Sequence, residues 1–194
     1  MDRFYLIVPD AETLARLVPL GVRLVQLRLK DAPDRAAQIA RAIALCKSHG
    51  TELVINDHWR EAIDLGAGFV HLGQEDLDTA DLPAIRRAGL RLGISTHDEA
   101  ELERALSCDP AHVALGPVYQ TLLKKMPWAP QGLDRVREWK RRIGALPLVA
   151  IGGLTPDRLP GVFAAGADSA AVVTDILRAP DPEARTRHWI EATR

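Results

Sequence analysis

The sequence of 194 residues predicts an α/β protein folded as a single-domain (β/α)8 TIM barrel. Eight short apolar segments alternate with eight stretches of helical periodicity along the chain. The apolar segments are rich in β-branched residues, which is typical of parallel strands covered on both faces. Eight units favour a closed barrel over an open doubly wound sheet. The glycine-rich dinucleotide fingerprint of an open sheet is also missing, because Pro9-Asp10-Ala11 follows the first strand.

The first half of the chain supplies four strand–helix units. Asp10 is placed to cap the first helix, and Pro33 and Gly50 are placed to start and stop the second. Cys46 falls on the apolar face of that second helix, so we expect it to be buried. We expect strands at residues 4–8, 24–27, 52–55 and 69–72, and helices at residues 11–20, 33–50, 59–65 and 82–88.

The second half repeats the pattern with one interruption, a long polar loop at residues 116–131. Loops of this length in compact domains are usually functional or mobile. We expect strands at residues 92–94, 112–115, 148–151 and 170–173, and helices at residues 98–106, 133–143, 156–165 and 181–192. The eight units fill residues 1–194 without a linker, so we expect one catalytic domain.

Composition excludes several classes of partner. The net charge of −1 gives no electrostatic footprint for a nucleic acid or an acidic membrane, so we expect neither. Cys46 and Cys108 lack metal-ligand spacing, and so few cysteines suit a reducing compartment. We find no secretory signal region and no apolar stretch long enough to span a bilayer. We therefore expect a cytoplasmic protein of undetermined oligomeric state.

Two apolar runs each lead to an acid. Residues 53–55 run into Asn56 and Asp57, and residues 69–72 lead through a short turn to Asp76. In a barrel both acids would lie at the C-terminal ends of adjacent strands, where active sites of this fold are found. Two carboxylates together with substrate phosphate oxygens suit Mg²⁺. The sequence therefore indicates a magnesium site.

A structural alternative stays open for each acid. Asp57 is also placed to cap the helix that would start at His58, and Asp76 is also placed to begin a turn with Asp78. His71, between the two acids in the chain, we interpret as a packed and hydrogen-bonded residue rather than a general base.

Cations and glycines at other strand ends indicate phosphate binding. Arg28 and Lys30 share one strand parity, so both can face a bound phosphate. Gly152-Gly153 after the seventh strand and Val173-Thr174 after the eighth match the phosphate-binding cup of this fold. A solvated pair of cations and an ordinary tight turn are the alternatives. Asp175 beside the cup is unfavourable for a phosphate unless its side chain points away.

These segments together resemble the thiamine phosphate synthase family over nearly the whole chain. The block at residues 70–76, with residues 55–57, is the most specific part. The matching segments in chain order are residues 26–30 (QLRLK), 55–57 (IND), 70–76 (VHLGQED), 92–96 (LGIST), 115–119 (LGPVY) with Thr121 and Lys124, and 150–153 (AIGG).

The resemblance implies a transferase of thiamine biosynthesis. Such enzymes join hydroxymethylpyrimidine diphosphate to thiazole phosphate and release pyrophosphate, by a dissociative substitution with a carbocation-like pyrimidine. It implies that Asp57 and Asp76 bind Mg²⁺ and that Arg28, Lys30, Ser95 and Lys124 are catalytic. By the same resemblance the pyrimidine diphosphate is held by Gln26, Leu27, Arg28, Leu29, Lys30, Asn56, Ser95 and Lys124, and the thiazole phosphate by Thr121, Leu122, Leu123, Gly153, Val173 and Thr174.

The chain departs from the family pattern in places. Leu123 stands where many members have a hydroxyl residue, and the final cup reads Val-Thr-Asp rather than Val-Ser-Ala. One alternative function is a thiazole tautomerase-type isomerase on the same barrel, but the histidine that this sister family implies is Pro117 here. A second is a non-catalytic phosphate-binding or regulatory barrel, which the set of acids and cations disfavours.

Overall fold

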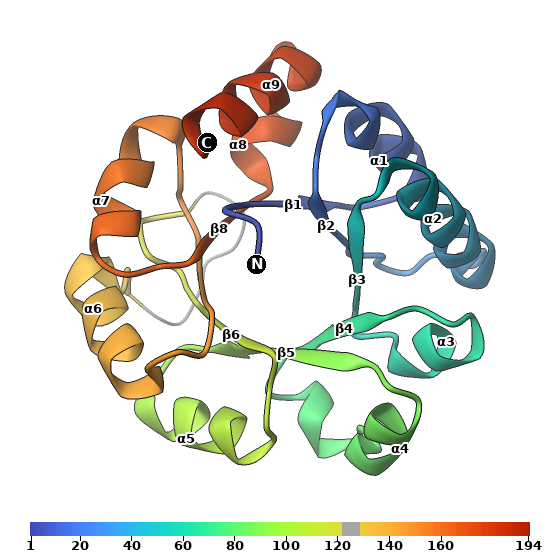
Figure 1. Cartoon of the computed structure of the whole chain (residues 1–194), viewed down its shortest axis with the longest axis horizontal. Coiled ribbons are helices and arrows are strands. Elements are labelled where there is room, and N and C mark those ends of the chain that lie inside the picture. The colour runs from blue at the N-terminus through green and yellow to red at the C-terminus, as the bar shows by residue number, and fades with distance from the viewer. Residues whose placement is uncertain (122–128) are drawn as a thin grey trace.

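The computed structural model describes residues 1–121 and 129–194 and has the predicted TIM barrel. Eight parallel strands pair in chain order, and the last strand pairs with the first through Phe4↔Ala170 and Leu6↔Val172. Figure 1 looks along the barrel and shows the strands as a ring inside a circle of helices. The strands are β1 (Phe4–Val8), β2 (Leu24–Leu27), β3 (Glu52–Asn56), β4 (Phe69–Leu72), β5 (Arg91–Thr96), β6 (His112–Leu115), β7 (Leu148–Ile151) and β8 (Ser169–Val172).

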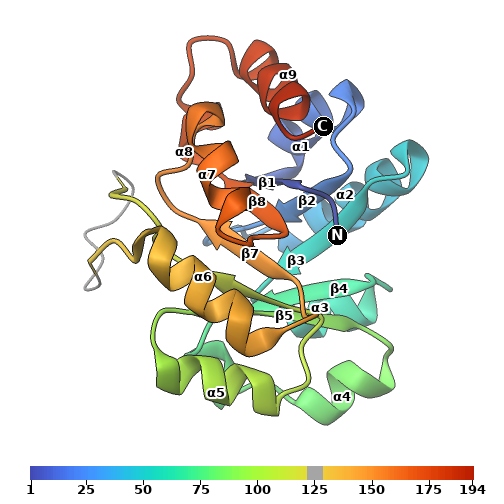
Figure 2. The same ribbon diagram turned by 60° about the vertical axis from the view of Figure 1, so that its left-hand side comes forward.

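Helices follow the strands and cover the outside of the barrel (Figure 2). Several begin with a capping aspartate, as predicted for Asp10, whose side chain accepts a hydrogen bond from the Thr13 N–H at 2.6 Å. The described helices are α1 (Ala11–Leu17), α2 (Arg35–His49), α3 (Trp59–Asp64), α4 (Leu82–Arg87), α5 (Glu99–Ser107), α6 (Gly132–Ile143), α7 (Leu159–Ala164), α8 (Thr174–Leu177) and α9 (Pro182–Ala192), with 3-10 turns η1 (Val18–Leu20), η2 (Asp76–Asp78) and η3 (Pro156–Arg158).

Prolines explain two differences from the predicted helices. The helix expected at residues 11–20 ends at Leu17 and continues as η1, which contains Pro19. The helix expected at residues 156–165 is divided into η3 and α7, and each begins with a proline at its N-terminus. Proline removes an N–H group and restricts the preceding residue, so an α-helix does not run through it undisturbed.

The barrel separates two packed regions, because alternate strand residues point inward and outward. Outward residues pack under the helices, where Trp139 and Trp189 are completely buried. The inward apolar cluster consists of Tyr5, Ile7, Leu24, Val54, Phe69, Ala114, Val149 and Ala171. Buried polar residues share the inward parity of these strands, namely Gln26, Asn56, His71, His112 and Ser169.

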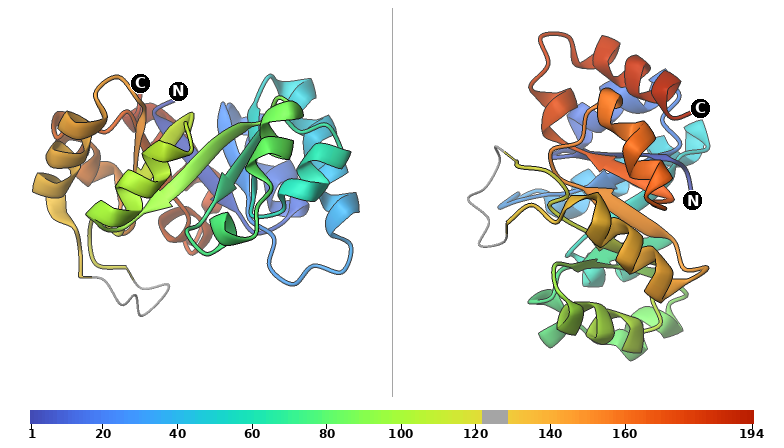
Figure 3. Two further views of the ribbon diagram at one scale, coloured as in Figure 1. Left: turned by 90° about the horizontal axis from the view of Figure 1, so that it is seen from below. Right: turned by 90° about the vertical axis from the view of Figure 1, so that its left-hand side faces the viewer.

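The two ends of the barrel differ in what they carry. Figure 3 (left) shows both chain termini at one end and the described residues that directly follow β6 at the other. The second end is formed by the C-terminal ends of the strands, where this fold builds its active sites. Within the part of the chain that the structure describes, no helix is long and apolar enough to cross a membrane.

Candidate active site

The C-terminal ends of β3 and β4 bring Asp57 and Asp76 against each other. The Asp57 N–H donates to the His71 carbonyl at 2.9 Å, and the Asp57 backbone has a φ of 64°. A left-handed conformation is uncommon for a residue other than glycine, and such strain often occurs at functional sites. Asp76 begins η2, and its Oδ2 accepts a hydrogen bond from the Gly73 N–H at 3.0 Å.

The electrostatic state of the pair shows how close these carboxyl groups are. The pKa of Asp57 is raised to about 6 by burial, by repulsion from Asp76 and by a hydrogen bond with Asp76. The Arg28 charge and a hydrogen bond from Asn56 act in the opposite direction. Two facing carboxylates of this kind are unfavourable alone and favourable around a cation.

The helix-cap alternative is wrong for Asp57. Helix α3 begins after His58 without a side-chain capping bond, so the Asp57 carboxylate is left to face Asp76. For Asp76 the alternative holds, because Asp76 does begin a turn that includes Asp78. A carboxylate oxygen that accepts one backbone hydrogen bond keeps further lone pairs for another ligand.

The donor set fits Mg²⁺ rather than a metal held by a closed cage of protein ligands. Among the described residues, no group of three or more His, Cys, Asp or Glu side chains is placed to hold a metal ion. Mg²⁺ usually takes one or two carboxylates and completes its shell with water and substrate phosphates. Asp57 and Asp76 together meet that requirement.

The end of β2 places cations beside the acid pair. Arg28 and Lys30 are exposed, and the Arg28 charge acts on both Asp57 and His71. Gln26 lies deeper in the barrel, where its Nε2 donates to the Tyr5 hydroxyl at 2.9 Å. Gln26 therefore lies inside the barrel below Arg28, whose charge is near the acid pair.

Leu27 and Leu29, predicted in the same segment, behave differently. Both alternate with the inward residues, and both side chains are buried in the core between the barrel and the helices. A ligand at the mouth can therefore meet only their backbone groups. Strand parity sends both side chains outward, so the predicted contact of these two residues with the substrate stays a prediction about their backbone groups.

A buried polar file runs below the mouth. His71 Nε2 lies 2.8 Å from Ser95 Oγ, and His71 Nδ1 lies 3.1 Å from His112 Nε2. His71 is therefore packed and hydrogen-bonded, as predicted, while Ser95 is half-buried at the mouth. The sequence prediction missed His112. Gly93 inside β5 could have indicated it, because a glycine within a strand often marks a place where another group approaches the backbone closely.

The loop after β6 packs on the glycine pair at the end of β7. The Tyr119 N–H donates to the Gly152 carbonyl at 3.0 Å. A Cβ on Gly153 would lie 2.5 Å from the Gln120 carbonyl oxygen and 2.8 Å from the Tyr119 Cβ. Glycine is required at position 153 by this contact and by its φ of 65°. The contact brings Thr121, one residue further along, to the same side of the mouth.

Asp175 points away from the cup formed with Val173 and Thr174. Its carboxylate accepts two hydrogen bonds from Arg185, at 2.8 and 2.9 Å, and a third from Trp189 Nε1 at 2.6 Å. Both partners lie on α9, so the charge is neutralised outside the barrel. The Asp175 carboxylate therefore does not repel a phosphate bound in the cup. Leu122, Leu123 and Lys124 lie outside the described residues.

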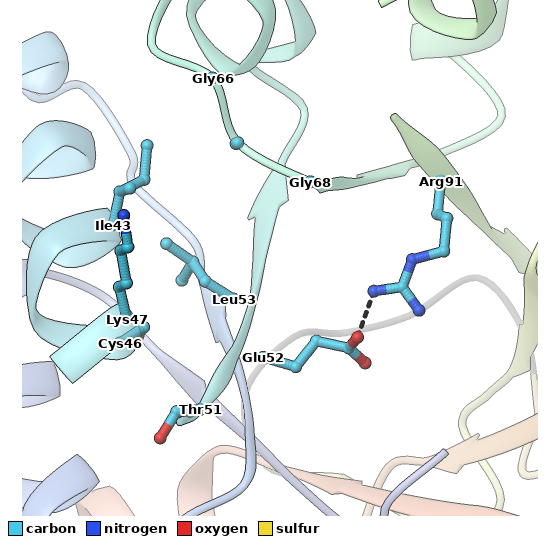
Figure 4. A pocket seen from close by; sticks show the side chains of 10 residues that line it. Ile43, Cys46, Lys47, Thr51, Glu52, Leu53, Gly66, Gly68 and Arg91 are labelled. Carbon is cyan, nitrogen blue, oxygen red and sulfur yellow. Dashed lines mark hydrogen bonds and ion pairs between the residues drawn. The ribbon is translucent and has the colours of Figure 1, made fainter. Parts of the chain in front are cut away.

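Pockets occur at both ends of the barrel. A cavity of about 270 Å³ beside the acid pair is lined by Arg35, Asp57, His58, Trp59, Arg60 and Glu61. A second, also about 270 Å³, lies at the opposite end and is lined by residues of α2, β3 and the turn before β4. Figure 4 shows that Glu52 and Arg91 pair with each other there. Only the first pocket includes a member of the acid pair.

Comparison with known proteins gives consistent results. A family model described as thiamine monophosphate synthase matches residues 4–176. The thiamine-phosphate synthase of Rhizobium etli is 62% identical over 195 residues, covering 100% of this chain and 96% of that protein. The thiamine-phosphate synthase of Neisseria meningitidis serogroup A is 50% identical over 184 residues, covering 94% of this chain and 90% of that protein.

Solved structures extend the likeness to the fold. The thiamine phosphate pyrophosphorylase from Pyrococcus furiosus has a TM-score of 0.84 at 25% identity, covering 98% of this chain and 95% of that one. The orotidine 5'-phosphate decarboxylase from Pyrococcus horikoshii has a TM-score of 0.68 at 15% identity, covering 98% of each chain. The second likeness shows the shared barrel alone.

Proposed function

The chain belongs to the thiamine monophosphate synthase family and is a thiamine-phosphate synthase, a transferase of thiamine biosynthesis; from this premise we propose which residues perform the reaction. The substrates are hydroxymethylpyrimidine diphosphate and thiazole phosphate, and the products are thiamine phosphate and pyrophosphate. The observation that carries the proposal is the facing pair Asp57 and Asp76 with Arg28 beside it.

Asp57 and Asp76 hold Mg²⁺, and Arg28 and Lys30 bind the diphosphate next to it. Bound Mg²⁺ supplies positive charge that stabilises the diphosphate as it leaves. The support is electrostatic. The charge of Asp76 raises the pKa of Asp57, and exposed cations lie at the end of the adjacent strand. A guanidinium binds phosphate oxygens in a bidentate manner.

The reaction breaks one bond and forms one. The bond between the pyrimidine methylene carbon and the diphosphate oxygen breaks, and its electron pair leaves with the diphosphate. The lone pair of the thiazole nitrogen then forms the new carbon–nitrogen bond. Gln26, Asn56 and Ser95 line the inward side of the mouth and hold the pyrimidine, which positions the carbon for attack.

The thiazole phosphate binds across the mouth, at the ends of β6, β7 and β8. Thr121, Gly153, Val173 and Thr174 are the described residues of this site. This site is supported by the orientation of Asp175, whose carboxylate points toward α9 and pairs with Arg185 there, away from the cup. Lys124 is proposed as a further cation on the leaving diphosphate, and Leu122 and Leu123 as thiazole phosphate contacts; these three lie outside the described residues.

No general base is required, because the attacking nitrogen carries its own lone pair. His71 is suited to hydrogen bonding instead. Burial lowers its pKa to about 4, so the ring is neutral at physiological pH. The tautomerase alternative is not supported by the full-length relatives, which are synthases, and the same relatives disfavour a non-catalytic barrel.

A coupled assay tests the proposal. The purified chain is mixed with Mg²⁺ and both phosphorylated heterocycles, and pyrophosphate and thiamine phosphate are measured together. We expect equal amounts of the two products. Omitting the thiazole phosphate separates coupling from hydrolysis of the diphosphate. Pyrophosphate release that does not depend on the thiazole would contradict the proposed reaction.

Two predictions remain for experiment. One catalytic domain over residues 1–194 is supported by strands and helices that run from Phe4 to Ala192. A cytoplasmic location is consistent with two free, buried cysteines. The oligomeric state is left open.

A further inference from the structure

Three residues connect the closed interior of the barrel to the mouth. His112 Nε2 lies 3.1 Å from His71 Nδ1, and His71 Nε2 lies 2.8 Å from Ser95 Oγ. The two imidazole rings stack, with centroids 5.2 Å apart. His112 is 1% exposed and His71 is 6% exposed, whereas Ser95 is half-buried. We call His112, His71 and Ser95 the histidine file.

The neighbouring strand leaves space for this file. A Cβ on Gly93 would lie 2.7 Å from His71 Nδ1 and closer still to the His112 ring. Gly93 lies inside β5 and its φ is not in the left-handed region, so its backbone does not require glycine. Glycine inside a strand weakens that strand. Room for the two rings is therefore the physical reason for a glycine at this position.

Both rings are almost completely buried, and burial disfavours a charged imidazole, so the file has only two hydrogen-bond directions. A neutral imidazole has one N–H group and one bare nitrogen. In the outward direction, His112 Nε2–H donates to His71 Nδ1 and His71 Nε2–H donates to Ser95 Oγ. In the inward direction, both bonds are reversed and the Ser95 hydroxyl donates to His71.

The unpartnered ring nitrogen of His112 favours the outward direction. The outward direction leaves His112 Nδ1, which has no hydrogen-bond partner among the described residues, as a bare nitrogen, whereas the inward direction would place an N–H group there. Buried donors without a partner are rarer than acceptors without one. An anionic substrate at the mouth also orients N–H dipoles toward itself.

We propose that His112 is a positioning residue that acts through His71 to turn the Ser95 hydroxyl proton toward the pyrimidine diphosphate. The inference rests on the proposed function, which places Ser95 in that substrate site. In the outward direction His71 occupies a lone pair of the Ser95 oxygen. The hydroxyl proton is then left to the substrate.

A double-mutant cycle tests the coupling. His112→Phe keeps an aromatic ring but removes both nitrogens, and Ser95→Ala removes the hydroxyl. We expect each variant to lower kcat/KM for the pyrimidine diphosphate by about tenfold, the size of one hydrogen bond, with an unchanged KM for thiazole phosphate. The double variant should be no worse than Ser95→Ala. If the loss in the double variant equalled the product of the two single losses, His112 would not act through Ser95 and the proposal would be overturned.

Ser169→Ala is the matched control. Ser169 is fully buried on the inward side of β8, and its hydroxyl also has no hydrogen-bond partner among the described residues. We expect wild-type kcat/KM from this variant. A similar loss in Ser169→Ala would mean that any change in the barrel interior lowers activity, which would contradict a specific role for His112.

The direction of the file can be measured without any loss-of-function variant. Nitrogen-15 NMR of the histidine rings in the wild-type chain distinguishes the two tautomers. We expect protonated Nε2 and bare Nδ1 in both His71 and His112. Protonated Nδ1 in His71 would establish the inward direction and overturn the proposal, even if His112→Phe failed to fold.

The outcomes separate this inference from the proposed function. Wild-type kcat/KM in Ser95→Ala would contradict the proposed role of Ser95 and, with it, the positioning role. A loss in Ser95→Ala combined with wild-type kcat/KM in His112→Phe would overturn the positioning role alone.

Discussion

The two ends of the barrel arrange their charges in opposite ways. At the mouth, Asp57 faces another carboxylate, and Arg28 and Lys30 form no ion pair with any residue that the structure describes. The left-handed backbone of Asp57 adds strain there. The mouth therefore holds charges that are favourable only when a charged ligand is present.

The opposite end pairs its charges within the fold. Lys140 Nζ lies 2.8 Å from Asp168 Oδ2, and the same oxygen accepts a hydrogen bond from the Leu148 N–H at 2.8 Å. Glu52 and Arg91 form a second pair there. The opposite end therefore contributes to the stability of the fold, whereas the mouth carries the residues proposed for the reaction, as is usual for this fold.

Removing one carboxylate from the mouth gives the largest expected effect. We expect Asp57→Asn and Asp76→Asn each to lower thiamine phosphate formation by roughly 10²–10³-fold, because a metal ion and its charge stabilisation are lost. Both variants should be at least as stable to denaturant as the wild type, since a like-charge contact is relieved. Asp78→Asn is the control, because this neighbouring acid is 67% exposed and pairs with Arg104. Full activity in both mouth variants would remove the proposed metal site.

Adding magnesium should stabilise the folded protein, and this stabilisation should depend on the acid pair at the mouth. At a hundred times its dissociation constant, Mg²⁺ should raise the free energy of unfolding of the wild type by about 2.7 kcal/mol. Denaturant unfolding with and without Mg²⁺, at constant ionic strength, measures this. Asp57→Asn should not respond. An equal response in the variant would locate the bound magnesium elsewhere.

Breaking an ion pair at the opposite end should lower the stability of the protein and leave its activity unchanged. Asp168→Ala removes a half-buried ion pair and leaves the Leu148 N–H unpaired, so we expect a loss of about 1–2 kcal/mol in the free energy of unfolding. The kcat should not change. Asp134→Ala, which breaks a solvent-exposed pair with Arg137, should cost less than about 0.5 kcal/mol. A large loss of kcat in Asp168→Ala would break the division between the two ends.

The interior between the ends should respond to acid. Burial, together with the His71 and Arg91 charges, lowers the pKa of His112 well below 6.5. Below that pH the unfolded chain binds a proton that the folded chain does not, so stability falls as the pH falls. The expected slope from His112 reaches about 1.4 kcal/mol per pH unit. Unfolding measured from pH 7 to pH 5 should show a shallower slope in His112→Phe, and equal slopes would mean that His112 takes up its proton in the folded state.

Most of the barrel follows from local patterns. The strands are predictable because burial on both faces makes them continuous apolar runs, and Asp10 caps the first helix where the sequence places a cap. The element that was missed, α8, has only four residues, too few to show helical periodicity. Residues 92–94 were expected as a strand that extends over Arg91–Thr96, because Gly93 and Ser95 weaken the apolar pattern.

The candidate site is predictable where position along a strand decides it. Asp57 and Asp76 end adjacent strands, so parallel pairing alone brings them to one edge. His112 could not be found in this way, because its contact with His71 crosses 41 residues and the barrel interior. The direction of the Asp175 side chain depends on Arg185, which lies 10 residues further along in the last helix, outside the strand-end pattern that identifies the cup. The functional roles themselves stay predictions until the variants are measured.

Gly93 restricts the order in which the barrel interior can change. A side chain at position 93 would collide with the rings of His71 and His112, so it becomes tolerable only after smaller residues have replaced both histidines. The reverse order passes through a clash in the packed interior. Position 93 is therefore epistatic with positions 71 and 112: a side chain at position 93 is harmful in this chain and acceptable only in a homologue that has smaller residues at both histidine positions. Laboratory evolution of the interior should replace the histidines before Gly93.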